Sequence, residues 1–79
     1  MEARLIIEFD REGDILHIGK VAPYAEQDSH ELDYGLVARR NPNTGEIENL
    51  EILFFSKRAA DGGVLRLPVL AEFREPGSA

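Results

Sequence analysis

The sequence predicts a mainly β protein, an antiparallel β-meander of two hairpins with four to five strands. Short runs of β-branched and aromatic residues alternate apolar with polar side chains, and polar turns that contain glycine separate these runs. No stretch has the length and period of a long amphipathic helix. The chain of 79 residues suffices for one small domain, which we place at residues 1–75, with a disordered tail at 76–79.

The first hairpin is predicted from residues 4–9 and 15–21, which flank a polar turn at residues 10–14. Apolar side chains alternate along the first run, as in a strand with one buried face. Gly13 lies within the turn, and we expect it to adopt a positive φ. His17 lies in the middle of the second run, so we expect it on the face opposite its apolar neighbours.

The second hairpin is predicted after an acidic connection. Residues 22–33 are expected to form mainly a loop, with a short extended piece near residues 29–32. Gly35 then opens a strand at residues 36–40. The segment Asn-Pro-Asn-Thr-Gly at residues 41–45 has the composition of a tight turn that ends in a left-handed glycine.

The longest predicted strand covers residues 46–55. Its alternation slips near Asn49, and a β-bulge there would bring four apolar side chains to one face: Ile47, Leu50, Ile52 and Phe54.

The C-terminal third is predicted to be less regular. One helical turn is expected at residues 56–61, with Ser56 as its N-cap and Gly62-Gly63 after it. Residues 64–74 are apolar but include Pro68, which leaves two alternatives. Pro68 either starts a short helix or interrupts a strand-like arm that docks on the sheet or on another chain, and we favour the arm.

The composition narrows the classes of function. Fifteen acidic and nine basic residues give a net charge of −6, which suits a basic protein partner and opposes a phosphate backbone. The basic pairs Arg39-Arg40 and Lys57-Arg58 fall at opposite ends of the second hairpin, so no nucleic-acid binding is expected. The chain has no cysteine, so a domain this small would gain stability by oligomerisation, and a homodimer is expected.

The sequence shows no apolar run of membrane-spanning length and no signal-peptide layout at its first residues. We therefore expect a cytoplasmic protein that does not contact membranes. It also shows no phosphate-binding loop and no converging nucleophile and base, so neither a cofactor nor an enzymatic activity is expected.

Two sets of residues are candidates for a site. The first is a partner-binding set of acidic and apolar side chains: Glu26, Asp28, Glu31, Asp33, Leu67, Val69 and Phe73. The alternative is a weak site for a metal ion or a small molecule, held by Asp28, His30 and Asp33. For His17 we expect either a filler position on an amphipathic strand or a polar partner across the sheet, rather than a role as a general base.

A series of short motifs runs from Leu5 to Arg58. An aromatic-Asp pair precedes a turn closed by a second Asp, and a strand follows; later come a glycine-led strand, a turn glycine, an apolar strand and a Ser-Lys-Arg ending. In this chain they are Phe9-Asp10, Asp14-Ile15-Leu16-His17-Ile18, Gly35-Leu36-Val37, Gly45, Leu50-Glu51-Ile52-Leu53 and Ser56-Lys57-Arg58. Together they resemble a prokaryotic family of small proteins, domain-of-unknown-function family 2283.

This chain departs from the family pattern at two places. His17 stands where the family usually has tyrosine, and Phe54-Phe55 replaces a smaller, more polar pair. The resemblance implies a compact β-meander with no assigned activity. Members of the family are often encoded beside small toxin-like proteins, so it also implies an antitoxin-like role with a protein partner.

Overall fold

The computed structural model describes residues 4–77, which form one antiparallel sheet and one short helix. The elements are β1 (Ile6–Asp10), β2 (Ile15–Gly19), β3 (Asp28–Asp33), β4 (Leu36–Arg40), β5 (Ile47–Leu53) and α1 (Phe55–Ala60). All four pairings in the sheet are antiparallel, so the predicted mainly β class is confirmed. The expectations for residues 1–3, and for Ser78 and Ala79 of the tail, lie outside the described residues.

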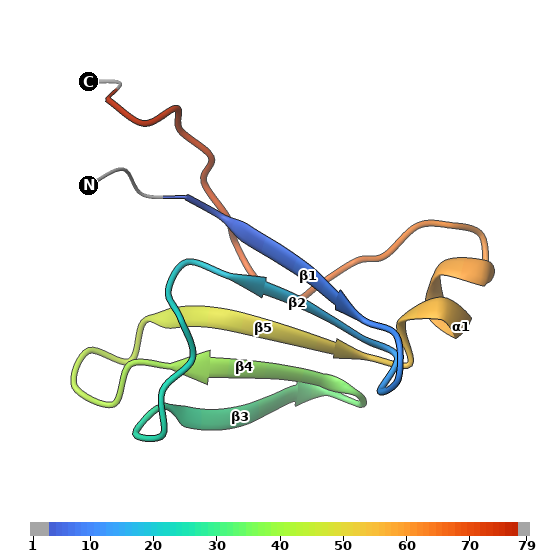
Figure 1. The fold of residues 1–79 in the computed structure, drawn as a ribbon, viewed down its shortest axis with the longest axis horizontal. Coiled ribbons are helices and arrows are strands. Elements are labelled where there is room, and N and C mark those ends of the chain that lie inside the picture. The colour runs from blue at the N-terminus through green and yellow to red at the C-terminus, as the bar shows by residue number, and fades with distance from the viewer. Residues whose placement is uncertain (1–3, 78–79) are drawn as a thin grey trace.

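The strands are arranged in the order β1-β2-β5-β4-β3 (Figure 1). The predicted meander is met in part: β1 lies beside β2, and β3, β4 and β5 follow one another, but β5 rather than β3 lies beside β2. Strand β5 lies in the centre of the sheet, and residues 20–27 cross from β2 to the far edge, where β3 begins. The strand compositions explain the order, because β5 is apolar enough for a central position whereas β3 carries charges that suit an edge.

The sequence pattern at β3 predicts mainly a loop, with an extended piece of four residues. The structure makes all of Asp28–Asp33 a strand, paired along its length with β4. A register shift between Glu31 and Asp33 leaves Leu32 as an extra residue, which is a β-bulge. The strand forms because β4 offers a partner, not because its own side chains alternate in hydrophobicity.

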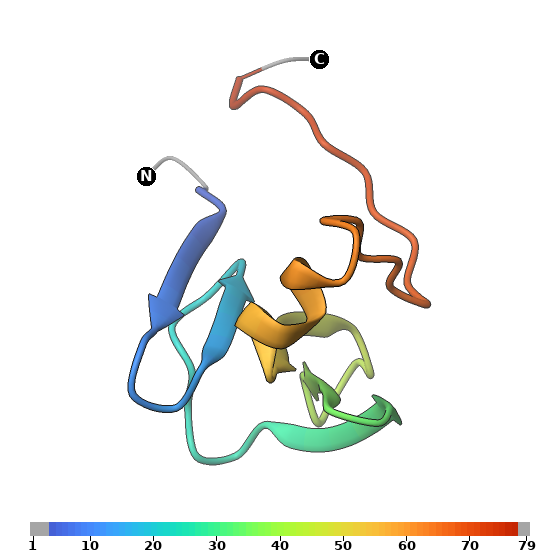
Figure 2. The same cartoon turned by 90° about the vertical axis from the view of Figure 1, so that its right-hand side faces the viewer.

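One face of the sheet carries the apolar side chains. Since cross-strand partners share a face, the registers place the following residues together: Ile7, Phe9, Leu16, Ile18, Leu36, Ala38, Leu50 and Ile52. Figure 2 shows α1 and the chain after it on one side of the sheet. We call residues 64–77 the arm, and the apolar face, which the first part of the arm covers, the arm face.

The core is small. Among residues 4–77, the buried apolar side chains are Leu36, Ala38 and Ile52, and Ile52 is the one large side chain that is fully buried. By contrast, all five residues of β1 are exposed. A core of this size stabilises the fold only modestly, which agrees with the expectation for a domain of 79 residues.

The predicted β-bulge in the longest strand is confirmed. Arg39 pairs with Asn49 but Arg40 pairs with Ile47, so Glu48 is the extra residue of β5. The shift places Ile47 on the same face as Leu50 and Ile52, as predicted. Phe54 does not join them, because its backbone is left-handed, with φ 56°, and the strand has ended at Leu53.

The turn between β1 and β2 is closed by an aspartate, not by its glycine. Asp10 accepts hydrogen bonds from the backbone N–H groups of Glu12 and Gly13, which is an Asx turn. The left-handed residue is Asp14, with φ 56°, so the prediction of a positive φ at Gly13 was wrong. Gly13 is needed for another reason: a Cβ there would lie 2.9 Å from the Asp10 carboxylate.

Helix α1 begins one residue earlier than predicted, and Ser56 is not its N-cap. The cap residue is Phe54, whose side chain makes no capping hydrogen bond. The Ser56 hydroxyl and backbone N–H both donate to the Asp14 carboxylate, at 2.7 and 3.0 Å. Asp14 therefore ties the first turn to the start of α1, and the left-handed Gly62 and Gly63 follow the helix as predicted.

This junction gives a testable expectation. Replacing Asp14 with alanine removes both hydrogen bonds from Ser56, and we expect the free energy of unfolding to fall by about 1–2 kcal/mol. Asp14→Asn keeps an acceptor and tolerates the left-handed backbone, so its loss should be smaller. Urea unfolding of Asp14→Ala, Ser56→Ala and the double variant measures the coupling, and additive losses would contradict the interaction.

The arm is neither helix nor strand. From Leu65 to Leu70 its residues alternate between half-buried and exposed, with Leu65, Leu67 and Val69 on the half-buried side. The Val69 N–H donates to the Leu67 carbonyl at 2.8 Å, a γ-turn around Pro68. The alternative in which Pro68 starts a short helix is absent from the described arm, and a docked arm without ladder pairing takes its place.

Within residues 4–77, the helix that is present is far too short to cross a membrane.

Candidate partner-binding surface

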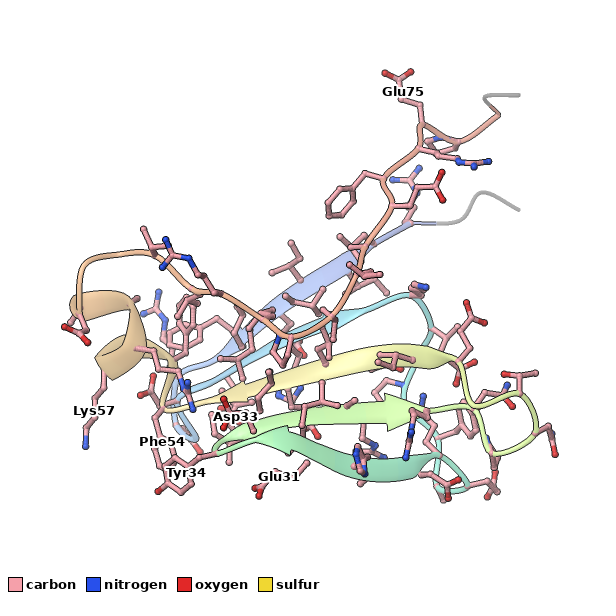
Figure 3. All side chains as sticks on the ribbon, turned by 180° about the vertical axis from the view of Figure 1, so that it is seen from behind. Glu31, Asp33, Tyr34, Phe54, Lys57 and Glu75 are labelled. Atoms are coloured by element: carbon pink, nitrogen blue, oxygen red, sulfur yellow. The ribbon has the colours of Figure 1, made fainter. Side chains whose placement is uncertain are left out.

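The predicted acidic residues lie along the free edge of the sheet that β3 forms. Asp28, Glu31 and Asp33 are exposed strand residues, and Glu26 is exposed in the connection that precedes them. The register puts Asp28 and Asp33 on the arm face and Glu31 on the opposite face. Figure 3 shows the same division, with the Asp33 and Glu31 side chains on opposite sides of the sheet.

The predicted apolar residues lie in the arm and differ in exposure. Leu67 and Val69 are half-buried against the sheet, whereas Phe73 is 81% exposed. Asp33 and Leu67 line one hollow of about 210 Å³ between the arm and the sheet. The structure thus brings one acidic and one apolar member of the predicted set together, while Glu26 and Glu31 lie elsewhere.

The floor and walls of this hollow combine apolar and charged groups. Its apolar lining comes from Leu36, Ile52, Val64, Leu65 and Leu67, and its charged lining from Asp33, Arg58, Asp61 and Arg66. Arg58 is fixed in place, because its guanidinium donates to the backbone carbonyls of Leu53, at 2.9 Å, and Tyr34. Next to it, the rings of Tyr34 and Phe54 stack with centroids 5.7 Å apart.

These contacts explain several of the motif residues. Gly35 has φ 72°, and a Cβ there would lie 2.6 Å from the Arg58 guanidinium. Asp14, Ser56 and Arg58 likewise serve the joint between the sheet and α1. These four motif residues are therefore structural within this chain.

The three residues of the metal alternative do not converge. β3 is extended, so Asp28 and Asp33 lie about 16 Å apart along the strand at ~3.3 Å per residue. Among residues 4–77, no group of three His, Asp or Glu side chains is placed to hold a metal ion. The metal alternative draws no support from this geometry.

A network of polar side chains fixes the crossing segment 20–27 to β5. The Glu48 carboxylate accepts hydrogen bonds from the Tyr24 hydroxyl at 2.6 Å and from the Gln27 amide at 3.1 Å. Asn49 accepts from Gln27 at 2.8 Å and donates to the Val21 carbonyl at 2.8 Å. Glu48 is the bulge residue and has no partner in β4. Its carboxylate instead anchors the crossing segment.

Hydrogen bonding in this network shifts two pKa values. The Tyr24 hydroxyl and the Gln27 amide lower the pKa of the Glu48 carboxyl below its usual 4.5. The same hydrogen bond to Glu48 raises the pKa of Tyr24 to about 12.

These shifts predict how stability depends on pH. A carboxyl whose pKa is lowered in the folded state stabilises the fold above its unfolded pKa, and that contribution is lost as the pH falls through the folded value. When the pH is lowered below about 4.5, we expect the urea concentration at the unfolding midpoint of the wild type to decrease. For Glu48→Gln the decrease should be smaller. Equal acid sensitivity in both proteins would contradict the assignment.

The tyrosine provides a second readout of the same network. The contribution of Tyr24 is present below its ordinary pKa of 10.0 and is lost as the pH rises through about 12. In a spectrophotometric titration, Tyr24→Phe should remove the ionisation step near pH 12. If that step remains in Tyr24→Phe, it does not belong to Tyr24, and the hydrogen bond to Glu48 does not explain it.

A second polar cluster lies on the face opposite the arm. Glu51 stands beside both His17, with Oε2 3.5 Å from Nδ1, and Arg39, with Oε1 3.5 Å from Nη1. His17 and Glu51 are cross-strand partners, which is one of the two alternatives expected for His17. Sequence reasoning missed Glu51 and Arg39, because the cluster depends on β2 pairing with β5, which no local pattern indicates.

This cluster borders a shallow hollow of about 440 Å³ beneath the crossing segment. Its lining contains Ile6, Glu8, His17, Gly19, Val21, Ala22, Pro23, Arg39, Asn49, Leu50 and Glu51. No hydroxyl or thiol is among these residues, so His17 and Glu51 have no nucleophile to activate there. The arrangement is an ion-paired surface around a mostly apolar depression.

Comparisons with known proteins add no relative. A scan against protein-family models found no match, and searches of curated proteins and of solved structures found none either. Membership of the family that the motifs resemble stays a prediction.

Proposed function

We propose that this chain is a non-enzymatic protein-binding and assembly module, which works as a homodimer and takes a basic protein as its partner. The observation that carries the proposal is the exposure of large apolar side chains on the arm. Leu70 is fully exposed and Phe73 is 81% exposed. These large apolar side chains stay outside a core that, in the described chain, contains only three buried apolar residues. Exposed apolar groups held on an irregular segment are typical of a surface that becomes buried on binding.

Charge supports the choice of partner. The chain carries a net charge of −6, and acidic side chains lie both on the arm face of β3, at Asp28 and Asp33, and on the arm itself, at Glu72 and Glu75. A basic partner would dock its apolar anchors on Leu70 and Phe73 and find complementary charge at the rim. An antitoxin-like role, which the resemblance implies, is the special case in which this partner is a small basic toxin-like protein.

The experiment is affinity capture of the tagged full chain from its host after mild cross-linking. We expect the wild type to retain one basic protein in stoichiometric amount, and Leu70→Ser/Phe73→Ser to retain at least about tenfold less. The matched control Ala71→Ser/Arg74→Ser changes two residues of the same segment without removing a large apolar side chain or a carboxylate. It should retain the partner.

Two further measurements sharpen the result. Raising the salt concentration from about 0.05 to 0.5 M should weaken the complex by accelerating dissociation and slowing association at the charged rim. Asp28→Lys/Asp33→Lys, which reverses the two β3 charges on the arm face, should weaken it in the same direction. An eluate that contains only this chain, or equal capture by both arm variants, would contradict the proposal.

A further inference from the structure

The two free edges of the sheet differ in a way that bears on assembly. β3 forms one edge, with acidic side chains along its length and a bulge at Leu32. Charges and bulges are the usual means by which an edge strand is kept from pairing with another chain. β1 forms the other edge, and no bulge interrupts its pairing with β2.

β1 is also the more apolar edge. The exposed fractions of Leu5, Ile7 and Phe9 are 48, 62 and 42%. β1 is the end strand of the sheet, so no strand of the described chain pairs with its outer edge; the arm crosses the first residues of β1 in Figure 1 but lies to one side of the sheet in Figure 2. An exposed, apolar and regular edge strand favours pairing with another strand.

The hydrogen bonds of β2 determine which backbone groups of β1 face outward. The Lys20 N–H donates to the Glu48 carbonyl at 2.9 Å, so Lys20 directs its backbone groups toward β5. Successive residues alternate, so His17 and Gly19 direct theirs toward β1, where they pair with Glu8 and Ile6. The N–H and C=O groups of Leu5, Ile7 and Phe9 are then directed to the free edge.

We infer that a second copy of this chain pairs with β1 in antiparallel orientation, about a two-fold axis at Ile7. This register places Ile7 opposite Ile7 of the second copy and Leu5 opposite its Phe9. All these residues direct their backbone groups outward, so each pair forms hydrogen bonds. The two sheets become one continuous sheet, and the apolar side chains of both edges meet on the arm face.

Charge and apolar pairing together select this register. Arg4 stands opposite Asp10 of the second copy, and Glu8 stands opposite its Ile6. Shifting the axis to Glu8 would place two carboxylates opposite each other, which is unfavourable. An axis at Ile6 would place Phe9 opposite a position that precedes residue 4 of the second copy, so Phe9 would have no partner among the described residues. The axis at Ile7 pairs all seven residues from Arg4 to Asp10.

This inference rests on the proposed assembly function and names the surface of its homodimer. It is independent of the arm: changes at Ile7 test the dimer, whereas changes at Leu70 and Phe73 test the basic partner. A loss of one therefore does not imply a loss of the other.

The test combines light scattering with disulfide trapping. The wild type should have twice the monomer mass of 8.8 kDa at micromolar concentration. Ile7→Lys places two lysines opposite each other and should reduce the mass to that of the monomer, whereas Ser29→Lys, an exposed position on the β3 edge, should remain dimeric. A wild type that stays monomeric, or an Ile7→Lys variant that stays dimeric, would overturn the inference.

Disulfide trapping covers the case in which Ile7→Lys does not fold. Directly opposed residues in a hydrogen-bonded pair have Cα atoms about 5.5 Å apart, within the range of a disulfide. The natural chain has no cysteine, so Ile7→Cys introduces a single thiol, as does the control Ser29→Cys. We expect a mild oxidant to convert Ile7→Cys to a covalent dimer much faster than Ser29→Cys. Equal rates, or faster trapping of Ser29→Cys, would place the interface elsewhere.

Discussion

Replacing Ile52 with alanine is expected to lower the free energy of unfolding by about 2–5 kcal/mol, the range for deleting a large aliphatic side chain from a core. Ile52 is 1% exposed in the central strand and pairs with Leu16 on one side and Leu36 on the other. Leu36 and Ala38 are the other buried apolar side chains of the described residues, so little of the core would remain without Ile52. Since a small domain has little stability in reserve, the variant should be largely unfolded at about 37 °C.

Ile6→Ala is the matched control for this change. It removes the same atoms from a strand residue that is 54% exposed, so the loss should be below about 1 kcal/mol. Both variants should be compared by urea unfolding at one protein concentration, because a dimer's stability depends on concentration. Similar losses for the two variants would mean that the core is not centred on Ile52.

Gly19→Ala is expected to lower the free energy of unfolding by about 1–3 kcal/mol, as overpacking does. A Cβ at Gly19 would run into the amide of the Asn49 side chain. Asn49 has little freedom to move, because it is buried and bonded to Gln27 and to the Val21 carbonyl. The added methyl group would therefore break a buried network as well as crowd it.

Gly45→Ala separates this packing effect from backbone strain. Gly45 has φ 76°, and a Cβ added there would meet no atom within 4 Å, so alanine costs only the left-handed conformation, about 1 kcal/mol. Urea midpoints of the two variants make the comparison. In addition, Gly19→Ala should expose the crossing segment to faster hydrogen exchange, and an unchanged exchange rate there would contradict the role given to Asn49.

Local sequence features predicted the local structure well. The turn at residues 41–45 forms around Asn41, whose side chain accepts hydrogen bonds from the N–H groups of Asn43 and Thr44, and it ends in the left-handed Gly45. The bulge in β5 followed from a slip in alternation, which is also a local signal. Turn chemistry and side-chain alternation act over a few residues, so both can be seen in the sequence.

The parts that sequence reasoning missed depend on contacts between distant segments. The acidic residues of β3 give no strand pattern, because its partner β4 supplies the hydrogen bonds. Ser56 is a good N-cap residue, yet it bonds to Asp14 because the left-handed Phe54 ends β5 early. The pairing of Glu51 with His17 and Arg39 likewise requires the register of three strands.

The central position of β5 has a consequence for the order in which this protein assembles during synthesis. The β1-β2 hairpin and the β3-β4 hairpin each pair within a short segment, but the sheet joins them only through β5, which follows both in the chain. On the ribosome the two hairpins therefore emerge as separate, incomplete units. Closing the loop between β2 and β5 is the costly, long-range step, and the cooperative transition must await the emergence of residue 53.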